Sequence, residues 1–158
     1  MGVQTMPRSL SERSGLRMRI LGIGILLCVC NGCFDPCAND EVVRVPSPDV
    51  KFEAVIFQRD CGATTDFSTQ ISVLPKGTSL PKAGGNVYIG DSNHGAAPTA
   101  KWGGPPVDVK WSANRQLTVV THPAARIFRN ESTVSVSTGI FSEETVTVEY
   151  TIIAGPRE

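Results

Sequence analysis

The sequence predicts an all-β protein, a single antiparallel sandwich or small barrel of six to seven short strands that follows a signal segment. Three observations predict this class. Short segments with alternating apolar and polar residues recur from about residue 51 to residue 153. Turns rich in Gly, Pro, Asn and Asp separate them. No amphipathic helical stretch longer than two turns follows the signal, which is typical of sandwiches and small barrels.

The chain begins with the features of an export signal. Basic side chains within residues 13–19 precede an apolar run of eleven residues, 20–30. A membrane-spanning helix needs about 20 apolar residues, whereas the core of a signal peptide needs about 7–15. Residues 1–32 are therefore predicted to be a signal peptide, and a more compact signal would begin at Met18.

Cys33 is the predicted lipidation site. The segment Cys30-Asn31-Gly32-Cys33 resembles the lipoprotein cleavage pattern Leu-(Ala/Ser)-(Gly/Ala)-Cys, which implies an acyl group on Cys33. Gly32 matches this pattern, while Cys30 and Asn31 depart from it. An ordinary cut nearby is the alternative, and it would give a secreted soluble β protein without lipid.

Counting cysteines supports the same cut. Cleavage before Cys33 removes Cys28 and Cys30, and lipid occupies Cys33. Cys37 and Cys61 then remain as an even number of thiols in an oxidising compartment, which predicts a disulfide. Such a bridge closes a loop of about 25 residues and contributes about 3 kcal/mol. No Cys-x-x-Cys or paired histidine accompanies these cysteines, so no metal site is predicted.

Composition limits the partners and the location. After the predicted cut the chain carries slightly more carboxylates than basic side chains, with no block of like charge. Nucleic acid would require a basic stripe, so it is not an expected partner. Membrane contact is expected through the lipid anchor alone. Phe34 stands where aspartate would resemble an inner-membrane retention signal, which favours the outer membrane of the cell envelope.

The first elements follow from proline content and alternation. Residues 33–48 are predicted to be a tether, because they hold three prolines and no periodic apolar pattern, and residues 49–158 the β domain. Lys51–Gln58 is apolar on both faces and is predicted to be a strand. Phe67–Leu74 alternates, and Asn86–Gly90 is a short apolar strand.

The later elements include a hairpin. Val107–Ser112 alternates with Val107, Val109 and Trp111 facing inward, and an Asn-Arg turn returns the chain into Gln116–His122. Arg126–Phe128 is predicted as a short edge piece. The remaining predicted strands are Thr133–Ser137 and Thr145–Ile153.

Four segments resemble an uncharacterised family of small bacterial exported proteins and lipoproteins. They are Arg59–Thr65 (RDCGATT), Phe67–Leu74 (FSTQISVL), Gly85–Ile89 and Asn93–Gly95. The resemblance covers about Ser47 to Tyr150, and it implies a bacterial source and a compact domain without implying an activity.

The candidate binding loop contains Asp91, Asn93 and His94, within a stretch dense in turn-forming residues. Loops on a rigid sheet often carry binding sites, and a plain surface loop is the alternative. Trp102, between a polar loop and Gly/Pro turns, either packs on the end of the sandwich or is exposed as an anchor for a partner.

The predicted function is that of a lipid-anchored envelope protein whose β domain binds a protein or a cell-envelope component. No Gly-x-Ser-x-Gly elbow and no zinc motif occur, so no enzyme activity and no cofactor are predicted. The alternative is a small periplasmic hydrolase that uses His94 with Asp91 or Ser92. The sequence leaves the oligomeric state open.

Overall fold

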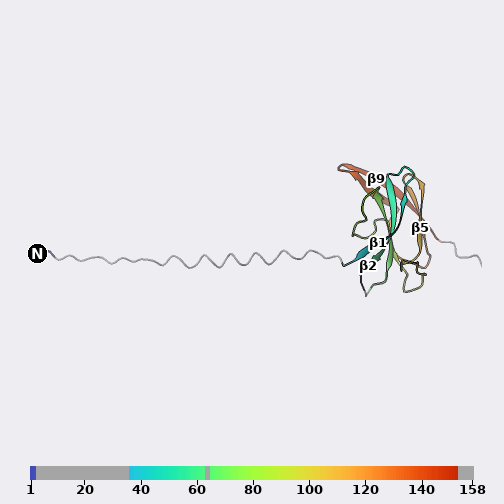
Figure 1. Ribbon diagram of the computed structural model, residues 1–158, viewed down its shortest axis with the longest axis horizontal. Helices are drawn as coiled ribbons and strands as arrows, with labels where there is room; N and C mark the ends of the chain where they lie inside the picture. Colours follow the sequence, from blue (N-terminus) through green and yellow to red (C-terminus); the bar gives the residue numbers. More distant parts are fainter. Residues whose placement is uncertain (3–35, 63–64, 153–158) are drawn as a thin grey trace, which may run out of the picture. The chain divides into compact units, whose positions relative to one another are not determined.

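Figure 1 presents the computed structural model, which describes residues 1–2, 36–62 and 65–152. The chain divides into two units, Met1–Phe34 and Asp35–Glu158. The predicted signal core and Cys33 lie outside the described residues. The described residues contain no helical segment with the length and apolar character needed to cross a membrane.

Nine strands form two sheets in the described part of the second unit. Sheet A has the order β1-β2-β3-β4-β7, and sheet B has the order β5-β6-β9-β8. The strands are β1 (Ala38–Pro46), β2 (Phe52–Asp60), β3 (Ser68–Pro75), β4 (Tyr88–Asp91), β5 (Val107–Ala113), β6 (Gln116–Thr121), β7 (Arg126–Asn130), β8 (Thr133–Gly139) and β9 (Ser142–Ile152). The two sheets confirm the predicted all-β sandwich.

Pairing is antiparallel throughout both sheets except between β6 and β9, which run parallel. The predicted β5–β6 hairpin is confirmed, with Val107 opposite Thr121 and Ala113 opposite Gln116 across a two-residue turn. Val107, Val109 and Trp111 point into the core as predicted, because every second residue of a strand faces the same side.

The predicted tether was wrong for residues 38–46, which form β1 and raise the number of strands above six or seven. β1 pairs with β2 along its whole length, from Ala38 opposite Asp60 to Pro46 opposite Glu53. It is an edge strand with mostly exposed or half-buried side chains, so it has no alternating apolar pattern. Proline is tolerated at such an edge, because one side of the strand needs no ladder partner.

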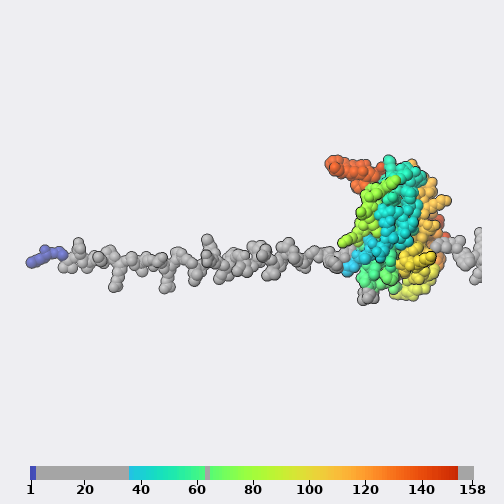
Figure 2. All heavy atoms as spheres, in the orientation of Figure 1, coloured from blue at the N-terminus to red at the C-terminus, as the bar shows by residue number. Residues whose placement is uncertain are grey.

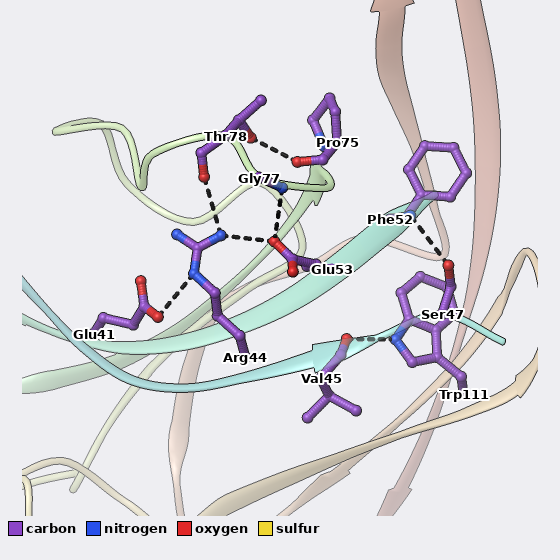
Figure 3. Close-up of polar contacts among 10 residues, drawn as sticks. All are labelled: Glu41, Arg44, Val45, Ser47, Phe52, Glu53, Pro75, Gly77, Thr78 and Trp111. Carbon is purple, nitrogen blue, oxygen red and sulfur yellow. Dashed lines mark hydrogen bonds and ion pairs between the residues drawn. The ribbon is translucent and has the colours of Figure 1, made fainter. Parts of the chain in front are cut away.

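The core lies between the sheets. Its largest fully buried side chains include Phe52, Ile71 and Tyr88 from sheet A and Leu117 from sheet B. Trp111 on β5 also reaches across to sheet A, where its indole Nε1 donates to the Val45 carbonyl at 2.9 Å (Figure 3). This bond joins the edge strand β1 to the opposite sheet.

Two tyrosines at one end of the core differ in their hydroxyl partners. Tyr88 Oη is buried and has no hydrogen-bond partner among the described residues, and burial raises its pKa to about 12. Tyr150 Oη lies 3.1 Å from both the Val87 and the Glu131 carbonyls. The rings lie 6.5 Å apart.

This difference predicts opposite responses to the same chemical change. Tyr88→Phe removes an unpaired buried hydroxyl and is expected to leave the free energy of unfolding unchanged or raise it by up to about 1 kcal/mol. Tyr150→Phe removes a satisfied hydroxyl and is expected to lower it by about 1 kcal/mol. Urea unfolding of the two variants measures both values, and equal losses would contradict the assignment.

A loop between β3 and β4, residues 76–87, covers part of the outer face of sheet A. Arg44 on β1 donates to Glu41 at 2.8 Å, to Glu53 at 2.9 Å and to the Thr78 carbonyl at 3.0 Å (Figure 3). Gly77 N donates to the same Glu53 carboxylate at 3.2 Å. These bonds hold the loop against β1 and β2, which explains why β2 buries side chains on both of its faces.

Candidate functional site

The uncovered end of the outer face of sheet A forms a cleft of about 410 Å³, called the outer-face cleft below. Successive side chains of a strand point to opposite faces of the sheet. Tyr88 on β4 faces the core, so Ile89 and Asp91 both point to the outer face. The cleft is lined from strands by Arg59, Ser68, Ile89, Asp91, Arg126 and Phe128, and from loops by Cys61, Thr65, Asp66 and His94.

An ion pair between Asp91 and Arg126 forms the floor of this cleft. β4 and β7 place the two residues opposite each other in the ladder. Arg126 Nε donates to Asp91 Oδ1 at 3.1 Å, and Arg126 Nη2 pairs with Oδ2. The Arg126 guanidinium also lies over the Phe128 ring, 5.0 Å from its centroid. A two-point contact with a carboxylate fixes the guanidinium in one orientation.

The loop after β4 brings His94 to the same place. Asn93 and His94 both have positive φ, 51° and 56°, in the left-handed region that Asn and His enter more readily than most residues. Asn93 N donates to Asp91 Oδ1 at 2.9 Å, and Ala97 N donates to the Ser92 carbonyl at 3.0 Å. These bonds close the loop, and His94 Nε2 comes to lie 3.3 Å from Arg126 Nη1.

The electrostatics of the cleft favour an ionised Asp91. Burial raises the pKa of the Asp91 carboxyl, but the hydrogen bonds from Arg126 and from the Asn93 amide outweigh it, so that the pKa lies below its ordinary value of 3.8. Asp91 is 5% exposed. A buried carboxylate held in this way stabilises the fold only while it is charged.

This gives a pH-dependent prediction. Because the folded-state pKa of Asp91 is depressed, its contribution is complete above the unfolded-state pKa of about 4 and is lost as pH falls through the folded-state value. Asp91→Asn is expected to cost about 1–3 kcal/mol of unfolding free energy at pH 7 and less at pH 3. Urea unfolding at both pH values measures this, with the exposed Asp108→Asn as control. An Asp91→Asn loss that is the same at both pH values would contradict it.

The structure brings together some of the predicted site residues and separates others. Asp91 and His94 line the cleft, and Asn93 supports it through its backbone amide. Trp102 does not join them. Its side chain is half-buried, and Nε1 donates to Oγ1 of the buried Thr69 at 2.8 Å. Thr69 Oγ1 in turn donates to the Pro105 carbonyl at 2.7 Å, so Trp102 packs on the end of the sandwich.

Of the ten lining residues, Asp91 and His94 were predicted for the binding loop and Cys61 for the disulfide, and the other seven were not predicted as site residues. Arg126 and Phe128 belong to β7, whose five side chains are all exposed and carry no alternating pattern. Arg59 lies on β2, and its Nη1 donates to Asn39 Oδ1 at 2.7 Å and to the Lys82 carbonyl. The register of β7 against β4 shifts at a bulge between Ile89 and Gly90. The sequence alone does not show this bulge, so it does not predict which charged residue at the end of β7 reaches the cleft.

The groups that line the cleft differ in arrangement from those of a hydrolytic triad. His94 contacts the Arg126 guanidinium rather than the Asp91 carboxylate, whereas in a hydrolytic triad a carboxylate orients the histidine. Within the described part of the chain, no group of three or more His, Cys, Asp or Glu side chains could hold a metal ion. Two guanidiniums, two carboxylates, an imidazole and two apolar side chains surround the space.

The rim of the cleft is tied down by the Cys37–Cys61 disulfide, whose Cα atoms lie 4.0 Å apart. Asp60 Oδ1 accepts from Gly62 N at 2.8 Å in the following turn. Comparison of the chain with models of protein families, with curated proteins and with solved structures finds no match. Function is therefore inferred from the N-terminal sequence, the disulfide and the outer-face cleft.

Proposed function

We propose that this chain is an exported protein of the bacterial cell envelope, anchored by lipid on Cys33, whose β-sandwich binds another envelope molecule in the outer-face cleft. The observation that carries the proposal is the Cys37–Cys61 disulfide. Disulfides persist in oxidising compartments and are rare in the cytosol. The bridge therefore agrees with the export signal of residues 1–32.

The same bridge supports a lipid on Cys33. With Cys37 and Cys61 joined, Cys33 is the one cysteine that remains after the predicted cut without a disulfide partner in the sequence. An acylated first residue accounts for it. β1 begins at Ala38, so a lipid on Cys33 would leave only a few residues between the anchor and the folded domain.

The composition of the cleft supports binding of a protein or peptide surface. Ligand pockets usually combine apolar walls with a few placed polar groups and have volumes of about 300–1,000 Å³. Ile89 and Phe128 supply the apolar wall, and Arg126 and Asp91 supply fixed charges of both signs. A site that carries charges of both signs suits a partner surface that also carries charges of both signs. It also suits a segment that combines apolar and acidic residues.

The anchor is tested by intact mass and by fractionation of the full-length protein expressed in a bacterial host. The mature protein is expected to begin at Cys33, to carry acyl chains and to be lighter by two hydrogens from the disulfide. Cys33→Ser is expected to remove the acyl mass and release the protein from membranes. Cys28→Ser, inside the predicted signal but outside the cleavage pattern, is the matched control and should leave the mature mass unchanged. A mature protein without acyl mass would overturn the anchor.

The binding role is tested by cross-linking in intact cells. Arg126→Gln is expected to reduce cross-linked envelope products of the wild-type protein about tenfold or more, since loss of one anchoring side chain commonly has this effect. Lys110→Gln, an exposed position on sheet B, is the control. Equal yields from the two variants would overturn the role of the cleft.

A further inference from the structure

We propose that the outer-face cleft binds the tip of the β8–β9 hairpin of a second copy of this chain, so that copies associate head to tail. This inference rests on the cleft being a binding surface, as proposed above. It names the partner from two surfaces of the molecule, an apolar projection and a recess lined by apolar side chains and by charges of both signs.

The projection is the hairpin tip, Ile140 and Phe141, which are 92% and 99% exposed. They form the two-residue turn between Gly139 and Ser142. Neither residue has a positive φ, so this turn does not use the left-handed conformations of the common two-residue hairpin turns. Both side chains are almost fully exposed, so they contribute no burial to the folded domain. Local choices that oppose folding and solubility mark functional positions.

The hairpin also extends away from the rest of sheet B. β9 pairs with β8 from Ser142 onward but with β6 only from Thr147 onward. The end of the hairpin is thus a two-stranded arm, and Figure 2 shows it, in red-orange, projecting from the body of the domain. Such an arm presents its tip to another molecule.

The recess fits an aromatic or branched apolar side chain. The cleft of about 410 Å³ is lined on one side by Ile89 and by Phe128, itself 60% exposed. The Arg126 guanidinium lies at its floor, stacked on Phe128. Aromatic side chains pack well on other aromatic rings and on guanidinium planes, so Phe141 of a second copy has partners in both.

Charge complements this fit. Glu143 follows the tip and is exposed, whereas Glu144 already pairs with Arg115 and Lys51. No Lys or Arg occurs between Arg129 and Arg157, so the arm is purely acidic. The Arg126 side chain in the cleft is 42% exposed despite its ion pair. An acidic tip is attracted to the exposed part of that guanidinium, which lies beside the cleft carboxylates Asp66 and Asp91. An anionic lipid surface offers no such cation and repels the tip, which favours a second copy over a bilayer.

The contact joins two different surfaces, because the tip belongs to sheet B and the cleft to sheet A, and a two-fold dimer would hold two such contacts. Each copy therefore offers one projection and one recess, and association closes into a ring or continues as a chain. Attachment to a membrane would raise the effective concentration and favour this association.

The test is sedimentation of the full-length mature protein in detergent, with and without two variants. The wild type is expected to associate. Phe141→Asp, which loses the projection, and Arg126→Glu, which loses the recess, are each expected to weaken association about tenfold or more. Mixed together they should form one-to-one dimers, since the Phe141→Asp copy keeps an intact cleft and the Arg126→Glu copy an intact tip. Phe128→Ser serves as a second recess variant, and circular dichroism checks that each variant is folded.

The outcomes separate this inference from the proposed function. A wild-type protein that stays monomeric, variants that associate as the wild type does, or a mixture without dimers would overturn it. So would loss of binding to protein-free anionic vesicles on Phe141→Asp, which would assign the tip to lipid. A monomeric protein whose envelope cross-links still depend on Arg126 would overturn the second-copy partner while the proposed function stands. The exposed Ile152→Ala, on the distal half of β9, is the control and should associate normally.

Discussion

Replacing Cys37 and Cys61 together by alanine is expected to lower the free energy of unfolding by about 3 kcal/mol and the midpoint temperature by roughly 10–15 °C. The bridge closes a loop that contains all of β1 and all of β2. β1 is an edge strand whose one ladder partner is β2, so it is the strand of this sheet least held by packing. The bridge restrains the N-terminal end of β1. Thermal and urea unfolding measure both quantities.

Two controls accompany this variant. Reduction of the wild-type protein with a thiol should reproduce the loss, because it opens the same loop without altering side-chain volume elsewhere. Cys28→Ala, within the predicted signal, should leave the unfolding of the mature protein unchanged. A loss below about 1 kcal/mol in the double variant would mean that the ladder with β2 and the side-chain bonds of Trp111 and Arg44 suffice to hold β1.

Gly85→Ala is expected to lower the free energy of unfolding by roughly 3 kcal/mol, the upper end of the cost of overpacking. A Cβ at Gly85 would lie 2.7 Å from the carbonyl oxygens of both Ile71 and Tyr88. These are backbone atoms of β3 and β4, which cannot turn aside as a side chain can. Gly85 N also donates to Gln70 Oε1, and its carbonyl accepts from Arg129, so the loop cannot shift without losing these bonds.

The adjacent glycine provides the matched control. A Cβ at Gly84 would lie 3.3 Å from Gln70 Oε1 and 3.5 Å from Ile89 Cδ1, both at the ends of flexible side chains. Gly84→Ala is therefore expected to change the free energy of unfolding by less than about 1 kcal/mol. Urea unfolding compares the two variants, and similar losses would show that the close approach at Gly85 is not what limits the packing of this loop.

The sequence predicted those strands whose alternation of apolar and polar residues matches their burial in the folded domain. Val107–Ser112 and Gln116–His122 alternate and are joined by a turn, and the β5–β6 hairpin follows that pattern. β1 could not be predicted, because an exposed edge strand with Pro46 at its end carries no apolar period. The parallel pairing of β6 with β9 joins segments far apart in the chain, and period-2 alternation does not choose a partner.

The candidate site was predicted only where its residues lie close together in the sequence. Asp91, Asn93 and His94 lie in a run of turn-forming residues, which is a local signal, and two of them reach the cleft. Arg126 joins them only because β7 pairs with β4 across an intervening hairpin, which the sequence does not encode locally. Residue type left two alternatives for Trp102, packing on the end of the sandwich or exposure as an anchor, and its bond to Thr69 agrees with the first.

The place of β9 in sheet B bears on when the domain can fold. Although it is the last strand in chain order, β9 lies between β6 and β8 rather than at an edge. Sheet B therefore stays incomplete until residues up to Ile152 are free to pair. A polypeptide threaded through a narrow translocation channel would keep an open apolar core until its C-terminal region emerged. If the chain is exported as proposed above, holdases that shield such exposed chains are then expected to contact it during its biogenesis.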